Sequence, residues 1–225
     1  MRNPILVGER VYLRPVEVQD AEGLANIDAV ETDTFMWRGP MPSSPLGHEK
    51  WIAKLYEHLP PRDIAFAVCL KEGDRFIGMV GVYGVDFVNR VGETGSYLGP
   101  AEVRDKGYGT EAKHLLLEYC FDRLHLHVLQ SFVLETNTRS SAALAKQGYR
   151  HAGRVKWADV KNGRYVDANV YDLMVTNGSS RATHGSRAGR AAKWRLRSPQ
   201  RHVRRAPRRA RNAPPAQASL LPATG

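Results

Sequence analysis

The segment Arg104-Asp105-Lys106-Gly107-Tyr108-Gly109-Thr110 decides how this chain can fold. A β-rich run over residues 93–98 precedes it, and a helical pattern with one apolar face follows over residues 111–124. Gly107 and Gly109 let the backbone bend tightly, so that successive N–H groups can point into one concavity at a helix N-terminus. Such a concavity attracts phosphate. The context therefore predicts a phosphate cradle, although a plain turn would also account for the glycines.

Two better-known phosphate motifs do not fit this segment. No Gly-Lys-Ser/Thr follows the loop, so the lysine and the magnesium-binding hydroxyl of an NTPase P-loop are missing. No Gly-x-Gly-x-x-Gly with a downstream acid follows a first strand, which disfavours a dinucleotide fold. His125 and His127 have no acid or cysteine at ligand spacing, so a zinc site is not expected. What remains is a pyrophosphate held without a metal ion.

Strand-like and helix-like runs alternate along the first 175 residues. Residues 64–70 and 75–83 form a hairpin pattern, and Asn162-Gly163 is a strong turn signal between runs at 150–157 and 165–174. Helices are expected from Asp20 as N-cap, over 48–57 and over 138–147. The order predicts an α/β fold with a mixed, mostly antiparallel sheet of about six to seven strands flanked by helices.

Charge divides the chain into two parts. The formal net charge is +10 over 225 residues, yet all 23 acidic residues precede residue 178, and the last 48 residues carry 12 Lys and Arg. We therefore expect a folded domain over residues 7–176 and a disordered, Arg-rich tail over 177–225. The tail could contact RNA non-specifically through phosphates, or could be a solvated extension of biased composition.

The sequence shows no signal-peptide core and no apolar run long enough for a membrane span, so a cytoplasmic protein without a membrane partner is expected. Cys69 and Cys120 lie in apolar runs and do not make a disulfide framework, which predicts two buried free thiols. A monomer and a homodimer both stay open.

Two blocks of the sequence resemble one known family. The first combines Glu93-x-Gly-x-Tyr97-Leu98-x-Pro100 with Arg104-x-x-Gly-x-Gly-Thr-Glu-Ala112, and the second is Asn137-x-Arg-Ser140 followed by Lys146-x-Gly-Tyr149. At this spacing they resemble the GCN5-related N-acetyltransferases (GNAT), in particular the RimJ/RimL-type branch that acetylates the N-termini of ribosomal proteins. The resemblance covers residues 7–175 and leaves out the tail.

The resemblance implies a GNAT fold with two central parallel strands splayed apart, and acetyl-CoA as acyl donor. The pyrophosphate would lie on backbone N–H groups of residues 104–110, and the pantetheine arm between the strand ending near Leu98 and the strand starting near Val128. The residues that the resemblance assigns to the cofactor are Leu98, Arg104, Asp105, Lys106, Gly107, Tyr108, Gly109, Thr110, Asn137 and Ser140.

Attack of an amine on a thioester needs a base, an oxyanion donor and help for the leaving thiolate. Glu93, eleven positions before Arg104, resembles the glutamate base of histone-acetylating members, although an exposed glutamate at the start of a strand is the alternative. It would act through water or with a raised pKa, because free Glu has a pKa of about 4.3. Backbone N–H groups around Tyr97 and Leu98 are the expected oxyanion donors.

The family's usual thiolate acid is a tyrosine, but Leu144 holds that position. Ser140 is the favoured substitute, with Tyr97 as a second candidate. Ser140 could instead only cap the helix that runs through Gln147.

The favoured acceptor is a protein N-terminal amine. A small-molecule amine (polyamine, aminoglycoside or amino acid) stays open, as does a non-catalytic CoA-binding protein with a nucleic-acid-binding tail. Asp28, Glu31 and Asp33 could favour a cationic acceptor or form a solvated helix end. The resemblance places five residues at the acceptor pocket: Phe35, Met36, Trp37, Trp51 and Tyr165. The alternative is that these side chains belong to the hydrophobic core.

Overall fold

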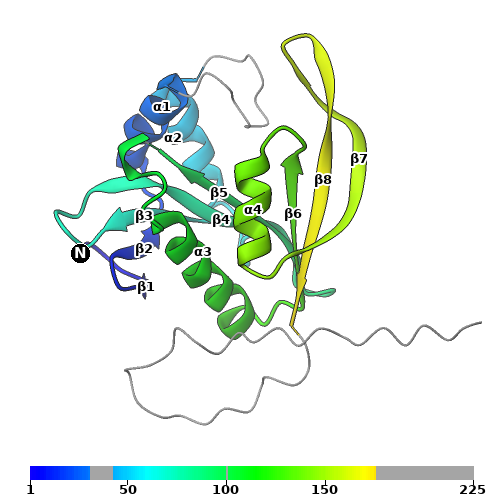
Figure 1. Cartoon of the computed structure of the whole chain (residues 1–225). Coiled ribbons are helices and arrows are strands. Elements are labelled where there is room, and N and C mark those ends of the chain that lie inside the picture. The colour runs from blue at the N-terminus through cyan, green and yellow to red at the C-terminus, as the bar shows by residue number, and fades with distance from the viewer. Residues whose placement is uncertain (31–42, 100, 176–225) are drawn as a thin grey trace, which may run out of the picture. The chain divides into compact units, whose positions relative to one another are not determined.

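The computed structural model describes residues 1–30, 43–99 and 101–175, and within them a mixed sheet carries helices on both faces (Figure 1). The predicted tail and the expected roles of Glu31, Asp33, Phe35, Met36 and Trp37 lie outside these residues. The strands are β1 (Leu6–Val7), β2 (Val11–Pro15), β3 (Ile64–Leu70), β4 (Phe76–Asp86), β5 (Val91–Leu98), β6 (Val128–Leu134), β7 (Arg150–Lys161) and β8 (Arg164–Met174). The helices are η1 (Val18–Asp20), α1 (Ala21–Val30), α2 (Pro45–Lys54), η2 (Ala101–Val103), α3 (Tyr108–Glu118), the π-helical η3 (Tyr119–Arg123) and α4 (Thr138–Lys146).

The described strands form one eight-stranded sheet in the order β1-β2-β3-β4-β5-β6-β8-β7. Neighbouring strands are antiparallel except β5 and β6, which pair in parallel. The mostly antiparallel sheet is therefore confirmed, with one strand more than the sequence predicted. The additional strand is the two-residue β1, which is too short to give a periodic pattern.

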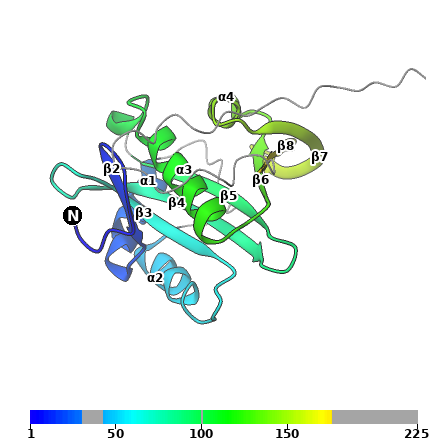
Figure 2. The same cartoon turned by 90° about the horizontal axis from the view of Figure 1, so that it is seen from below.

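Two apolar clusters cover the two faces of the sheet. On one face α1 and α2 bring Leu24 and Ile52 against Ala67 and Met79. On the other face α3 and α4 pack against the apolar side chains that β2, β3, β4 and β6 direct to that side. Figure 2 shows the strands between α2 and α3. Successive side chains of β3 and β4 point to opposite faces, and both faces are covered by helices. For this reason the sequences of β3 and β4 are nearly continuous apolar runs.

Several local predictions can be compared with the structure. The thiols of Cys69 and Cys120 are free and buried, as expected. The Asn162-Gly163 turn joins β7 to β8, and both residues have positive φ, as a two-residue hairpin turn requires. The predicted N-cap role of Asp20 is wrong: its carboxylate accepts hydrogen bonds from the Arg14 guanidinium at 2.7 and 2.6 Å and from the backbone N–H of Glu17 at 2.8 Å.

The Arg14–Asp20 pair joins β2 to the start of α1, and both side chains are buried. We expect Arg14→Ala to lower the free energy of unfolding by about 3–5 kcal/mol, because it leaves a buried carboxylate without its cation. Urea unfolding checks this. Arg75→Ala is the matched control: Arg75 meets Glu102 at 3.5 Å on an exposed surface, so its loss should cost less than about 1 kcal/mol. Equal losses in the two variants would contradict the prediction.

Candidate active site

The predicted phosphate segment forms a cradle at the start of α3. Asp105 and Gly107 adopt positive φ of 59° and 82°, and Gly107 is the N-cap of the helix. The first intrahelical bond runs from Glu111 N–H to Gly107 O at 3.1 Å. The N–H groups of Tyr108, Gly109 and Thr110 therefore have no acceptor within the helix, and Gly107 has no side chain to cap them. Such N–H groups suit a phosphate.

Contacts with residues near the start of the chain hold this cradle in place. The Arg10 guanidinium donates to the Lys106 carbonyl at 2.8 Å and pairs with Glu111 at 3.1 Å. Glu111 also accepts from the backbone N–H groups of Arg10 and Val11 at 2.8 and 3.2 Å. Partial burial would raise the pKa of Glu111, but these donors and the guanidinium outweigh it and lower the pKa. An ionised Glu111 thus fixes the first turn of α3 to β2.

The parallel strands β5 and β6 separate after a short paired stretch. Their backbones pair only from Val91 to Glu93 on β5 and from Val128 to Gln130 on β6, and their arrows diverge in Figure 1. Two side chains bridge the next rung: the Thr94 hydroxyl donates to Gln130 O at 3.2 Å, and the Ser131 hydroxyl donates to Thr94 O at 3.0 Å. This is the splayed pair of strands that the resemblance implies.

The sheet register decides which N–H groups of β5 face the opening. Gly99 N–H donates to Ile77 O at 2.9 Å, which makes 77 and 99 a hydrogen-bonded pair. In an antiparallel ladder such pairs alternate, so the N–H of Tyr97 points to β4 and the N–H of Leu98 points away from β4, to the side where β6 has diverged. Of the two expected oxyanion donors, the geometry favours Leu98.

The cradle and the opening are adjacent. A Cβ atom at Gly109 would lie 2.5 Å from Leu98 Cδ1, so the glycine lets the first turn of α3 approach the end of β5 without displacing the Leu98 side chain. Arg104 Nε donates to Gly99 O at 3.3 Å and ties the connecting segment to the same strand end. A ligand with a pyrophosphate and a long thin arm can follow this path from the cradle to the Leu98 N–H.

The expected base, Glu93, lies half-buried on β5 at the last backbone-paired rung. Burial raises the pKa of its carboxyl, and the Lys113 cation opposes this by lowering it. A raised pKa suits a general base. Tyr97 is four residues further along the strand, about 13 Å away at the usual rise of a strand. Glu93 therefore needs intervening water to reach an amine at Leu98.

Lys113 occupies the first turns of α3 with its side chain only 3% exposed. Its ammonium nitrogen lies 5.8 Å from the centre of the Tyr149 ring, and the Tyr149 hydroxyl bonds to Thr94 Oγ1 at 2.6 Å. Burial lowers the pKa of Lys113 to about 7, while the negative charges of Cys120 and Glu93 would raise it. The sequence analysis missed this residue because its neighbours make an ordinary amphipathic helix.

Asn137 and Ser140 begin α4. The N-cap is Asn137, whose side-chain oxygen accepts from Ser140 N–H at 3.1 Å. The Ser140 hydroxyl is therefore not the cap, and it makes no hydrogen bond within residues 1–30, 43–99 and 101–175. Leu144 belongs to the buried core. Leu144 therefore offers no hydrogen bond to a ligand, whereas the hydroxyl of Ser140 can donate one.

Four side chains from separate elements meet on the face of the sheet that α1 and α2 cover, next to the end of β5. No short pattern in the sequence indicates this cluster. The Tyr97 hydroxyl donates to Asp28 Oδ1 at 2.7 Å, and His48 Nε2 lies 2.8 Å from Asp28 Oδ2. The Ser43 hydroxyl also donates to Asp28 and lies 3.0 Å from His48 Nε2. Asp28 is thus no solvated helix end, and the Tyr97 hydroxyl is already bonded to a carboxylate.

The residues expected at the acceptor pocket separate into core and surface. Trp51 packs against the apolar cluster beneath α1 and α2, whereas Tyr165 is 68% exposed on β8. Trp157 on β7 is 72% exposed, and its ring lies 5.7 Å from that of Tyr165. Because β6 ends at Leu134, opposite Ala168, residues 157 and 165 lie on β7 and β8 beyond the end of β6, toward the hairpin turn. That is the end at which β5 and β6 have separated.

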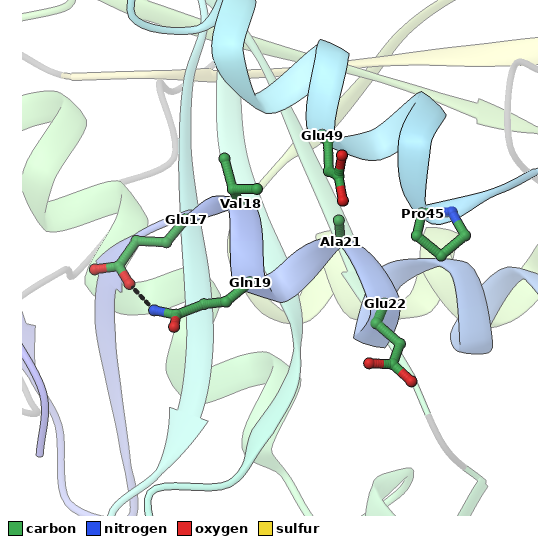
Figure 3. A pocket seen from close by; sticks show the side chains of 7 residues that line it. All are labelled: Glu17, Val18, Gln19, Ala21, Glu22, Pro45 and Glu49. Atoms are coloured by element: carbon green, nitrogen blue, oxygen red, sulfur yellow. Dashed lines mark hydrogen bonds between the residues drawn. The ribbon is translucent and has the colours of Figure 1, made fainter.

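A surface hollow lies between the start of α1 and α2, and Figure 3 shows the side chains around it. Its carboxylates belong to Glu17, Glu22 and Glu49. Asp28 follows Glu22 by six residues, about 9 Å along the helix axis. On α2, its lining residues Pro45 and Glu49 lie two residues from Ser43 and next to His48 in the sequence, so the hollow adjoins the helix that carries His48.

Two searches were confined to residues 1–30, 43–99 and 101–175. No group of three or more His, Cys, Asp or Glu side chains is arranged there to hold a metal ion. No helix in the same part of the chain is long and apolar enough to cross a membrane.

The cradle, the separated strands and the strand order together define an acetyltransferase domain. Residues 10–150 match the family described as "Acetyltransferase (GNAT) domain", and the chain belongs to this family. It is an N-acetyltransferase, and its acyl donor is acetyl-CoA. The three consecutive N–H groups of α3 and the opening at Leu98 fit that donor.

Individual relatives agree with this assignment. "Probable N-acetyltransferase YjcK" of Bacillus subtilis is 29% identical over 178 residues, which cover 76% of this chain and 97% of the relative. "Putative ribosomal N-acetyltransferase YdaF" of the same organism is 25% identical over 171 residues, or 75% of this chain and 93% of the relative. The fold is also that of spermidine N-acetyltransferase from Vibrio cholerae, solved with CoA and spermine: TM-score 0.67, 21% identity, covering 73% of this chain and 95% of that one.

We expect Gly107→Ala to weaken acetyl-CoA binding about five- to ten-fold, because a Cβ at φ 82° costs about 1 kcal/mol and would lie 3.0 Å from Arg10 Nη2, so the N–H groups shift. Calorimetric titration with acetyl-CoA measures this. Gly73→Ala is the matched control, since Gly73 has φ 71° in a remote turn with no atom near its Cβ position. Both variants should lose similar stability, and an equal loss of acetyl-CoA affinity in both would contradict the cradle assignment.

Lys113→Met should stabilise the domain, and most at low pH. The native Lys113 pKa of about 7 lies below the unfolded value of about 10.4, so from pH 7 upward the unfolded state binds the additional proton and wild-type stability rises. The advantage of the methionine variant should therefore shrink by at least about 1 kcal/mol between pH 6.5 and pH 9.5. Urea unfolding at the two values tests this, and a constant difference would show that Lys113 titrates normally.

Proposed function

We propose that the acceptor is the N-terminal amine of a protein, acetylated by direct attack on acetyl-CoA. The observation that carries the chemistry is the Leu98 N–H directed to the opening between β5 and β6. Two findings support a protein acceptor: the similarity to a relative named for ribosomal N-acetylation, and the exposed Trp157–Tyr165 pair beyond the open end. Exposed aromatic side chains are enriched at surfaces that bind other proteins.

In the proposed reaction the neutral amine nitrogen attacks the thioester carbonyl carbon. The developing oxyanion accepts the Leu98 N–H, and the C–S bond then breaks to release the CoA thiolate. Ser140, with its unengaged hydroxyl, donates a hydrogen bond to the sulfur. The proton lost by the amine passes through water to Glu93, whose raised pKa favours uptake. Tyr97 is a weaker candidate for the thiolate, because its hydroxyl already donates to Asp28.

A polyamine is the second candidate acceptor. The hollow with Glu17, Glu22 and Glu49 offers carboxylates to a polycation, and the spermidine N-acetyltransferase of Vibrio cholerae shares the fold. The hollow is lined by residues 17–22 and by α2, and by none of β5 or β6, so it is not part of the Leu98 opening itself. The exposed Trp157–Tyr165 pair beyond the end of β6 favours the protein N-terminus.

A thiol-release assay on the full chain decides between the acceptors. Acetyl-CoA is first titrated by calorimetry, and release of CoA thiol is then followed with peptides that begin with Ser or Ala, with spermidine and with kanamycin. Faster release with the peptides, and no release with the same peptides acetylated at the N-terminus, supports the proposal. Faster release with spermidine would replace it by the polyamine candidate, and release with none of these amines despite acetyl-CoA binding would contradict both.

We expect Ser140→Ala to lower kcat about ten-fold or more with little change in KM, because the serine stabilises the thiolate only as it leaves. Steady-state kinetics with the best amine of the panel measures this. Ser141→Ala is the matched control, one residue further along α4 and outside the proposed contact. An unchanged kcat for Ser140→Ala would exclude the role, and an equal fall in both variants would indicate damage to α4.

A further inference from the structure

The cluster of Asp28, Ser43, His48 and Tyr97 is joined to the proposed oxyanion donor through Tyr97, the residue directly before Leu98. Tyr97 precedes Leu98, and its side chain leaves the strand on the face covered by α1 and α2. At Gly99 a Cβ would overlap the side chain of Ile27, so the glycine lets the end of α1 rest on the strand directly after Leu98. Asp28 is therefore fixed beside the strand end where the thioester would lie.

We propose that His48, oriented by Asp28, takes the proton from the acceptor amine. This inference rests on the proposed acetyl transfer and adds to it the first proton acceptor. The transfer moves one proton from the amine nitrogen to a ring nitrogen of His48 as the N–C bond forms, and the imidazolium then releases that proton to water. Glu93, about 13 Å further down the strand, remains the later acceptor along the water path.

The hydrogen bonds determine which ring nitrogen is basic. A carboxylate only accepts, so the short contact from His48 Nε2 to Asp28 Oδ2 places a proton on Nε2. Nδ1 of the neutral ring then carries the lone pair. A carboxylate that fixes the tautomer and stabilises the imidazolium is the same arrangement that makes histidine a base in hydrolase triads.

Burial and the other donors support a functional cluster over a simple tie between helices. The side chain of Asp28 is 5% exposed and that of His48 is 12% exposed. Tyr97 and Ser43 donate to the two oxygens of Asp28 and hold the carboxylate in place. Apolar contacts of Leu24 and Ile52 already join α1 and α2 to the sheet, so a buried carboxylate and imidazole add a desolvation cost that the packing does not require.

The pKa scale also favours histidine over glutamate. Free histidine has a pKa of about 6.5 and free glutamate about 4.3. As free groups, imidazole is therefore a stronger base than a carboxylate by about two pKa units, and so the better acceptor for the proton that the amine nitrogen loses as the N–C bond forms. Within residues 1–30, 43–99 and 101–175, the groups that face the ring are the Asp28 carboxylate from α1, the Ser43 hydroxyl, and the Tyr97 phenol through Asp28.

Chemical rescue tests the role in the full-length enzyme. With the Ser-initiated peptide, or otherwise the panel amine that releases thiol fastest, His48→Ala should lower kcat/KM about 10²-fold or more. Added imidazole should restore at least about ten-fold of that loss, in proportion to its neutral form, because a diffusible base then fills the cavity. A structural role would give no rescue, which would overturn the proposal. His58→Ala, at an exposed histidine after α2, should change neither the rate nor its response to imidazole.

Asp28→Asn provides a second variant that keeps the side-chain shape. The amide would donate to His48 Nε2 and force the proton onto Nδ1, so kcat should fall about 10²- to 10⁴-fold while the thermal unfolding profile changes little. A fall no larger than a few-fold would contradict the orienting role of Asp28.

A measurement without any acceptor separates this inference from the proposed function. Nitrogen-15 spectra of the histidines in the full chain should show His48 protonated on Nε2, and its ring signals should shift with a non-reactive ketone analogue of acetyl-CoA but not with 3′-phospho-ADP. The Nδ1–H tautomer, or a signal indifferent to the acyl analogue, would overturn the role of His48. If no amine of the panel is acetylated while these signals behave as expected, the assigned acceptor is wrong and the position of His48 beside the acyl group stands.

Discussion

The opening between β5 and β6 is the constraint on which the rest of the structure depends. Backbone N–H and C=O groups inside a sheet need partners, and a sheet that separates in its middle gives up those partners along two strands. Thr94 and Ser131 close the first rung beyond Glu93 with side-chain hydrogen bonds, and the Tyr149 hydroxyl supports Thr94. Further along, Leu98 keeps an N–H directed into the opening, which acetyl-CoA is suited to use.

The cradle depends on contacts that are distant in sequence. Arg10 and Glu111 are about a hundred residues apart, yet their bonds hold the first turn of α3, and Gly109 brings that turn against Leu98. In the proposed function the donor is bound by backbone groups at the start of α3, whose positions these contacts set. In the proposed mechanism Ser140 on α4 serves the leaving thiolate, whereas Asp28 on α1 and His48 on α2 serve the acceptor amine.

The sequence predicted what local patterns encode and missed what only the assembled sheet brings together. The glycines at 107 and 109 predicted the tight turn at the start of α3, because a turn with these requirements leaves a short motif. The Asn162-Gly163 hairpin was predictable for the same reason. Asp28 was interpreted only as part of an acidic stretch, since its partners Tyr97 and His48 are 69 and 20 residues away and no short pattern joins them. Lys113 was missed because an amphipathic helix pattern does not show which polar residue turns inward.

In the proposed mechanism the amine is the more demanding of the two reacting groups, even though Leu144 holds the position where the resemblance implies a tyrosine acid. A thiol has a pKa of about 8.5, so its thiolate leaves at neutral pH with little more than a hydrogen bond, and a serine can supply that. The amine is different, because at pH 7 about a tenth of an α-amine is neutral but only about one in a few thousand of the side-chain amines of lysine type. The proposed site, with Ser140 for the thiolate and His48 for the amine, therefore suits an acceptor of low pKa. This is a physical reason, independent of any relative's name, to favour a protein N-terminus over a polyamine.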